Sequence, residues 1–265
     1  MDKQNRKIDW LMLGVWSVGI LIFLFLLLPS IIITISAFST SKYSTFPPHG
    51  FSLQWFEKLF IDDDWMEAIH NSLLLVLVVT PITTILGTMA AYGLNRLKLK
   101  ISSQIQAFLV SPLMIPQIII GIALLYVFAD WGLNGTFAAL AIGQILVAFP
   151  YVVRNVNASL VSIPPSLEAA SMSLGESPLR TFFRVTLPLI KGGIFSGAVM
   201  AAVTSLGEVS VSLLLSAPTD IPVSVRIFNY VEQTYDPAVN AVSVVFIAVS
   251  VLLLFLIGRK NGLKT

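Results

Sequence analysis

Glu168-Ala-Ala-Ser-Met-Ser-Leu-Gly175, followed by Val185-Thr-Leu-Pro188, is the part of this chain that decides its fold. Both pieces lie in a polar, charged insert, from about Arg154 to Lys191, which separates two blocks of strongly hydrophobic sequence. Gly175 is typical of a left-handed helix stop, and Pro178 favours the start of another helix because proline suits a first helical turn. The insert therefore predicts two short helices that are joined by a glycine turn and stand off a membrane.

The ends of these two helices are predicted from their capping residues. Ser166 is expected to cap the first helix, so that Glu168 lies in its first turn, where a carboxylate suits the positive end of the helix dipole. Leu187-Pro188 is expected to close the second helix. The apolar face of that helix carries Leu179, Phe182, Phe183 and Val185. The same pattern also fits an ordinary helix-turn-helix loop, so its meaning depends on the rest of the chain.

The composition of the chain indicates a membrane protein. Of its 265 residues, 56% are hydrophobic and 11% are charged, whereas a soluble domain carries about 25% charged residues. Too few charges are therefore available to cover a water-facing surface. The absence of cysteine excludes disulfides and thiolate chemistry. His49 and His70 are too few for a metal site, which needs about three or four protein ligands.

Six segments are long and apolar enough to cross a bilayer, since a spanning helix needs about 20 predominantly apolar residues. They are 11–38, 72–94, 105–128, 136–153, 194–215 and 238–257. The first is too long for a signal-peptide core and lacks a small-residue cleavage site, so we expect a retained helix. The predicted fold class is therefore an all-α integral membrane protein with six spans.

Lysine and arginine predict the orientation of the spans, because cytoplasmic loops carry an excess of both. With both termini in the cytoplasm, thirteen basic residues lie inside and three outside. The inner set is Lys3, Arg6, Lys7, Arg96, Lys98, Lys100, Arg154, Arg180, Arg184, Lys191, Arg259, Lys260 and Lys264, and the outer set is Lys42, Lys58 and Arg226. This excess predicts cytoplasmic termini and a cytoplasmic insert.

Two of the predicted outer connections between spans have distinctive sequences. Apolar residues between Phe51 and Phe60 recur at helical spacing, which predicts a short amphipathic helix. That helix either lies in the outer membrane interface or packs as part of a loop, and the sequence favours neither. The polar loop from Ser216 to Pro237 either re-enters the membrane or forms a cap that faces a soluble partner.

Glu208 is the one acidic residue inside a predicted span, and Ser205 lies among its polar neighbours. A charge at the bilayer centre is costly, so it usually lines a cavity or a helix interface. We favour a role for Glu208 in the substrate pathway or its gate. The alternative is a structural hydrogen bond to another helix.

Pro112 and Pro116 lie four residues apart in the third predicted span and are expected to kink or break its helix. The backbone groups freed by such a break must face protein or a water-filled cavity. Gln117 is therefore a candidate pathway residue, with a plain packing kink as the alternative. Asn71, where the second span begins, is a weaker candidate. Arg96, at the other end of that span, is interpreted as a helix stop and membrane anchor.

The insert resembles the EAA loop of bacterial ABC-type importer permeases, which has a glutamate, two alanines, a glycine, and then a hydrophobic residue before Leu-Pro. From Gly175 to Pro188 the spacing agrees with that family. Upstream, four residues separate Ala170 from Gly175 where the family usually has three, so Ala169 occupies the usual place of the glutamate. One place is about 100° of rotation on a helix, so the role of Glu168 is implied less firmly than that of Gly175.

The resemblance implies a type I ABC importer permease fold with a cytoplasmic EAA coupling helix. Residues 69–257 would form the transmembrane domain, 1–68 the N-terminal tail, first span and external interfacial helix, and 258–265 a cytoplasmic tail. The expected partners are an ATPase dimer, a second homologous permease that completes the substrate pathway, and an extracytoplasmic solute-binding protein, with no nucleic acid. The loop that couples to the ATPase would comprise Glu168, Ala169, Ala170, Gly175, Leu187 and Pro188.

The chain itself contains no G-x-x-x-x-G-K-[ST] phosphate loop. We therefore expect ATP and Mg²⁺ to bind to the partner ATPase, and we expect this chain to be neither an enzyme nor the holder of a cofactor. The implied location is the bacterial cytoplasmic membrane.

Further similarity bears on the substrate. Phe51-Ser-Leu-Gln-Trp-Phe56, Pro112-Leu-Met-Ile-Pro116 and Ile120-Gly-Ile-Ala-Leu124 resemble the second permease of spermidine/putrescine importers. Similar sequences serve 2-aminoethylphosphonate, iron(III) and thiamine systems, which remain alternatives. The rival classes are an ion-coupled secondary transporter, which usually shows inverted repeats, and a membrane-embedded enzyme, which needs clustered titratable groups.

Overall fold

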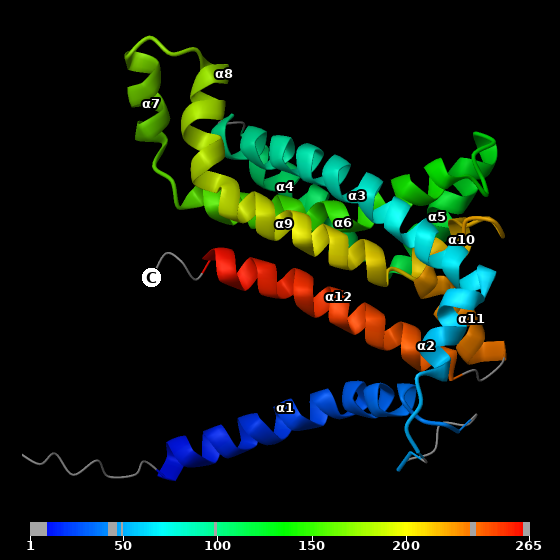
Figure 1. The fold of residues 1–265 in the computed structure, drawn as a ribbon. Coiled ribbons are helices and arrows are strands. Elements are labelled where there is room, and N and C mark those ends of the chain that lie inside the picture. Colours follow the sequence, from blue (N-terminus) through cyan, green and yellow to red (C-terminus); the bar gives the residue numbers. More distant parts are fainter. Residues whose placement is uncertain (1–9, 42–46, 49, 98–99, 234–236, 262–265) are drawn as a thin grey trace, which may run out of the picture. The chain divides into compact units, whose positions relative to one another are not determined.

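The computed structural model describes residues 10–41, 47–48, 50–97, 100–233 and 237–261, and the regular structure within these ranges is helical throughout (Figure 1). The all-α prediction is therefore confirmed. Some residues used above lie outside the described ranges, namely Lys3, Arg6, Lys7, Lys42, His49, Lys98 and Lys264. The chain divides into two compact units, which are described separately.

The first unit contains helix α1 (Trp10–Ala37), helix α2 (Gln54–Ile61) and the beginning of helix α12 (Ala238–Asn261). The segment after α1 folds back on itself: the indole N–H of Trp55 donates to the carbonyl oxygen of Ser39 at 2.8 Å, and the rings of Phe38 and Phe51 stack with centroids 5.4 Å apart. The predicted short helix is thus confirmed as α2. It buries Trp55 but leaves Phe60 exposed, so it has one packed side and one open apolar side.

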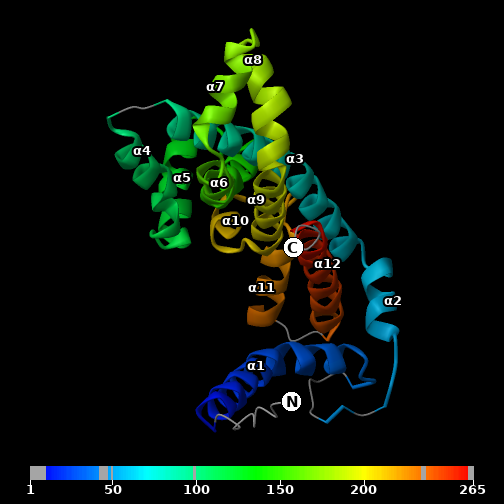
Figure 2. The same cartoon turned by 90° about the vertical axis from the view of Figure 1, so that its left-hand side faces the viewer.

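The second unit is built around three long helices, α3 (Asp63–Arg96), α6 (Phe137–Val161) and α9 (Leu187–Gly207), which pack on one another (Figures 1 and 2). Glycines allow the close approach. A Cβ on Gly87 would lie 2.7 Å from a methyl carbon of Val152, and one on Gly193 would lie 2.8 Å from the carbonyl oxygen of Asn155. The buried core between the helices includes Leu75, Val79, Val152, Val156 and Ile190.

Four of the described helical segments are long and apolar enough to cross a membrane: α1, α3, α6 and the continuous helix Pro178–Gly207. A fifth is obtained if Ser102–Leu113 and Gln117–Asp130, which meet at a bend of 99°, count as one span. The first piece is α4 (Ser102–Val110) with the 3-10 turn η1 (Ser111–Leu113), and the second is α5. The break predicted from Pro112 and Pro116 is confirmed. The described apolar part of α12, Ala238–Leu252, is shorter, so the count of six spans stays a prediction.

The predicted end of the second insert helix at Leu187-Pro188 is wrong. Helix α8 (Pro178–Thr181) continues through a π-helical turn, η2 (Phe182–Thr186), directly into α9. Proline has no backbone N–H and normally interrupts a helix. Here the N–H of Leu187 bonds to the carbonyl oxygen of Phe182, five residues back. The wider turn changes the hydrogen-bond register just before Pro188, the second residue of α9, so the helix continues past the proline.

The close packing of α6 against α9 yields a stability prediction. Gly193→Ala places a methyl group against the backbone of Asn155 and the side chain of Ser159, and overpacking of this kind costs about 1–3 kcal/mol. We expect a lower melting temperature for the purified protein. The control is Gly207→Ala in the same helix, where the added Cβ meets no atom of the described residues within 4 Å. Equal melting temperatures for the two variants would contradict the close approach.

Candidate functional site

A hairpin of α7 (Pro165–Ser173) and α8 projects from one end of the α3–α6–α9 bundle (Figures 1 and 2). Gly175 has a φ of +93°, which confirms the predicted left-handed stop. The N–H of Glu176 reaches the carbonyl oxygen of Ser171 at 3.3 Å, and that of Gly175 reaches Met172 at 3.0 Å. These two bonds are the pair that closes a helix with a Schellman turn.

The start of α7 differs from the prediction. The helix begins at Pro165, and the preceding Pro164 makes no side-chain capping bond. Proline favours the first helical position because its fixed φ is already helical and its missing N–H needs no partner there. Ser166 consequently lies inside the first turn, and its predicted role as the cap is wrong.

Polar contacts close the hairpin across its turn. The hydroxyls of Ser171 and Thr181 lie 3.1 Å apart and join α7 to α8. A guanidinium nitrogen of Arg184 lies 2.5 Å from a carboxylate oxygen of Glu176, although the Arg184 side chain is 70% exposed. An exposed ion pair of this kind contributes little to stability, so the Schellman turn and the hydroxyl contact define the shape of the hairpin.

Glu168 faces inward from α7 and is buried. Its Oε1 accepts hydrogen bonds from Nε of Arg96 at 2.9 Å and from Oγ1 of Thr186 at 2.8 Å. Arg96 also donates to Oδ1 of Asn95 at 2.8 Å. From the sequence, Glu168 was expected at the positive end of a helix dipole and Arg96 at the end of a span, and no contact between the two was predicted. The signal for this contact in the sequence was that Glu168 and Arg96 carry opposite charges and were both expected on the cytoplasmic side of the membrane.

The exposed surface of the hairpin combines apolar side chains with the basic side chains of Arg180 and Arg184, each 70% exposed. Five large apolar side chains are exposed there, and we call them the hairpin patch: Leu167, Met172, Leu174, Leu179 and Phe183. Leu174, beside the glycine turn, is 87% exposed. Ala169 and Ala170 are also exposed on α7 and add little bulk. Leu187 and Pro188 lie farther along the chain, in the first turn of α9. A cluster of exposed apolar side chains is typical of a surface that binds a partner.

Glu208 marks a break in the fifth predicted span. Helix α9 ends at Gly207, and a short helix, α10 (Ser210–Leu215), begins just after it. The buried carboxylate of Glu208 accepts from the N–H of Val211 at 2.9 Å and from both the N–H and the hydroxyl of Ser212 at 2.8 Å. The side chain therefore satisfies backbone donors that the break leaves open.

Gln144 extends this contact into a buried network. Its Oε1 accepts from the hydroxyl of Ser205 at 2.5 Å, and its Nε2 donates to the hydroxyl of Ser212 at 2.9 Å. The structure thus brings two predicted pathway residues, Ser205 and Glu208, into one network with α6. Gln144 was missed because a lone glutamine in an apolar span has no distinguishing pattern. These contacts support the structural alternative for Glu208, and its pathway role stays a prediction.

The other two predicted pathway residues lie elsewhere. Gln117 is partly buried at the first position of α5, just after the 99° bend. The amide of Asn71 donates to the carbonyl oxygen of Thr219 at 3.0 Å. Next to it, the hydroxyl of Ser72 accepts from the N–H of Val223, at the start of helix α11 (Val223–Gln233), at 2.8 Å. Asn71 and Ser72 therefore attach the segment from Thr219 to Val223 to α3.

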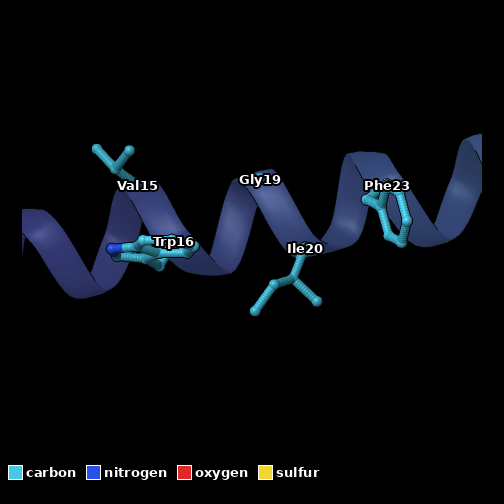
Figure 3. A pocket seen from close by; sticks show the side chains of 5 residues that line it. All are labelled: Val15, Trp16, Gly19, Ile20 and Phe23. Atoms are coloured by element: carbon cyan, nitrogen blue, oxygen red, sulfur yellow. The ribbon is translucent and has the colours of Figure 1, made fainter. Parts of the chain in front are cut away.

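A shallow hollow on α1 is lined entirely by that helix: Val15, Trp16, Gly19, Ile20 and Phe23 (Figure 3). Trp16 is 68% exposed. A lining with almost no polar groups suits contact with lipid chains or another apolar helix better than recognition of a polar solute. In the described part of the chain, no three acidic, histidine or cysteine side chains gather as a metal site would require.

Comparison with known proteins places the chain among transport proteins. Residues 83–259 match the family described as binding-protein-dependent transport system inner membrane component. The putrescine transport system permease protein PotI of Escherichia coli is 30% identical over 86% of this chain and 84% of its own length. The molybdate/tungstate transport system permease protein WtpB of Pyrococcus furiosus is 30% identical over 82% of this chain and 88% of its own.

The fold also has a counterpart among solved structures. A bacterial ABC transporter involved in the import of the acidic polysaccharide alginate has a chain that superposes with a TM-score of 0.71. The two chains are 16% identical, and the match covers 96% of this chain and 97% of the other. At that identity the likeness concerns the fold alone.

The Glu208 network predicts the effect of removing the charge. In Glu208→Gln, one carboxylate oxygen becomes an NH₂ group that faces the donors of Val211 or Ser212. A buried donor left unpaired costs about 1–3 kcal/mol, so we expect a lower melting temperature. Glu232→Gln, at an exposed position on α11, is the control and should behave as wild type. An unchanged melting temperature with altered substrate selectivity would instead support the pathway role.

Proposed function

We propose that the hairpin couples this chain, which belongs to the family of binding-protein-dependent transport system inner membrane components, to a separate ATPase. As a member of that family, the chain is an ABC importer permease without catalytic activity or a cofactor of its own. In this proposal the chain supplies half of the substrate pathway and a second permease supplies the other half. A solute-binding protein delivers the substrate. The observation that carries the coupling proposal is the projecting hairpin, whose exposed residues include five large apolar side chains.

The hairpin patch supports docking on the ATPase. Five large apolar side chains in water are unfavourable, and burial of apolar surface contributes about 25 cal/mol per Å². A short helix that presents such a face fits a groove on a partner, with the small Ala169 and Ala170 permitting close approach of the two backbones. Gly175 sets the angle between the α7 and α8 parts of the patch. Leu187 and Pro188 act in this proposal by continuing the hairpin into α9.

The proposed location is the bacterial cytoplasmic membrane, with six spans, cytoplasmic termini and the hairpin in the cytoplasm, where ATP is available. The excess of basic residues on that side, thirteen against three, supports this orientation. Reporter fusions after Lys100 and after Lys191 should therefore read cytoplasmic, and fusions near Asp63 and Asp220 external. A cytoplasmic reading at Asp220 would overturn the six-span topology.

The proposed substrate is a polyamine, with putrescine or spermidine as the first candidates. Support comes from PotI, whose name specifies putrescine transport, and from charge. Glu208 is the one formally charged residue in the six predicted spans, so any charge selectivity in the pathway would favour cations. WtpB, at the same identity, is named for oxyanions, which makes the sign of the substrate charge the property to measure.

Substrate charge is tested by uptake. Cells that express this permease with its cognate ATPase, second permease and solute-binding protein should accumulate labelled putrescine, and excess spermidine should compete. Molybdate should not compete, because an oxyanion would meet no basic side chain in the predicted spans. ATP-dependent uptake of molybdate without uptake of putrescine would contradict the polyamine proposal and leave the permease assignment intact.

The coupling proposal is tested at the glycine turn. Gly175→Val forces a β-branched residue into a left-handed conformation, which costs roughly 1–2 kcal/mol, and the two parts of the patch then meet the ATPase at the wrong angle. We expect loss of transport and weaker co-purification of the ATPase, with normal membrane insertion.

Gly132→Val is the matched control for this test. Gly132 has a similar positive φ of +67°, and a Cβ there meets no atom of the described residues within 4 Å. It lies between α5 and α6, away from the hairpin, so the same local strain should leave ATPase binding unchanged. Normal transport by Gly175→Val, or equal loss in both variants, would remove the support for coupling through the hairpin.

A further inference from the structure

One oxygen atom joins three structural elements at the base of the hairpin. Oε1 of Glu168, on α7, receives the guanidinium N–H of Arg96 at the last residue of α3 and the hydroxyl of Thr186 at the last residue of η2, where α9 begins. The side chains of Arg96 and Glu168 are only 12% and 9% exposed. Water competes weakly at such a contact, so both bonds hold their geometry.

The Arg96 guanidinium is itself held in place. It donates to Oδ1 of Asn95 at 2.8 Å and lies 3.4 Å from the carbonyl oxygen of Ile163, in the link between α6 and α7. The amide of Asn95 donates to Oδ1 of Asn157 on α6 at 3.1 Å. The planar, rigid fork of arginine fixes direction as well as distance. The ends of α3 and α6 and the start of α7 therefore share one connected set of polar contacts.

Glu168 points away from the surface proposed to meet the ATPase. Its neighbours in the chain, Leu167 and Ala169, are exposed, whereas Glu168 is buried. Successive residues on a helix differ by about 100° in direction. The carboxylate is therefore directed to the bundle while α7 presents its exposed side chains to the partner. Because Oε1 of this buried acidic residue is held by two donors inside the protein, we infer a task for Glu168 other than binding the partner.

We propose that Glu168 is a positioning residue of the coupling step, which passes a displacement of α7 to α3 through Arg96 and to α9 through Thr186. This inference rests on the proposed function, in which α7 docks on an ATPase. The directional hydrogen bonds that one carboxylate oxygen accepts from Arg96 and Thr186 make α7, α3 and α9 move together. Apolar contacts at the same place would hold the hairpin without fixing its angle, because the hydrophobic effect is non-directional.

The double variant Arg96→Met with Glu168→Leu separates coupling from stability. Replacing a buried ion pair by apolar residues of similar volume is often neutral for stability, whereas removal of one partner is not. The measurement is the ATPase rate of the reconstituted transporter with the solute-binding protein, relative to the rate without it. The binding protein is loaded with putrescine, or with molybdate if the uptake assay selects it.

We expect the double variant to keep a melting temperature near wild type and to retain the ATPase, while stimulation by the binding protein falls about tenfold, a typical size for coupling between sites. Wild-type stimulation in the double variant would overturn the proposal. If the double variant fails to assemble, Thr186→Val decides the matter. That isosteric change deletes one bond to Oε1, and stimulation should fall about fivefold; full stimulation would again overturn the proposal.

Glu176→Gln is the matched control, because it removes the exposed ion pair with Arg184 in the same hairpin and leaves the Glu168 contacts intact. Its stimulation should equal wild type, and a loss as large as that of Thr186→Val would contradict a specific role for Glu168. Failure of the proposed coupling function can be distinguished from failure of the positioning role of Glu168. If the wild-type chain binds no ATPase, the coupling function fails; if it binds one and all variants are stimulated normally, only the positioning role fails.

Discussion

The contact of the Glu168 carboxylate with Arg96 and Thr186 is the interaction on which the coupling end of this molecule depends. The hairpin projects from one end of the bundle, and its exposed residues include five large apolar side chains. Without a directional attachment at its base, α7 would be held by the chain on either side and by apolar contacts that permit sliding. One buried oxygen shared by two donors instead ties the hairpin to α3 and α9, the helices that also form the core with α6.

A second constraint acts along the helices. A helix that breaks inside a membrane exposes backbone groups that water cannot satisfy. The break after α9 is therefore accompanied by Glu208, whose carboxylate accepts from the N–H groups of Val211 and Ser212. The entry into α9 solves a related problem differently, since the π-helical turn carries the helix past Pro188. Polar residues and unusual turns in this chain thus coincide with interruptions in backbone hydrogen bonding.

These two constraints explain how far the sequence could predict the structure. The proline pair near Gln117 and the glycine turn at Gly175 are local signals, and each predicted the break or turn that is present. The apolar runs predicted the helical class, but the described residues supply four or five of the six predicted spans. At the start of α7, capping by Ser166 competes with a proline at the first helical position, Pro165. At Pro188, interruption of the helix competes with its continuation through a π-helical turn. The sequence does not show which preference is stronger, so both were mispredicted. The partners of Glu168 lie 72 and 18 positions away, and Gln144 reaches Ser212 over 68 positions. Periodicity and spacing along the chain carry no information about such pairs.

The central claim is that the hairpin patch is the surface that meets the ATPase, and site-specific crosslinking tests it most directly. The chain has no cysteine, so Leu174→Cys introduces a unique thiol for benzophenone maleimide at a side chain that is 87% exposed. Met114→Cys, at an 88% exposed position near the bend before α5, is the control. In the assembled transporter, illumination should join position 174 to the ATPase and leave position 114 free of it. Failure of position 174 to crosslink in a complex that contains the ATPase would contradict the account.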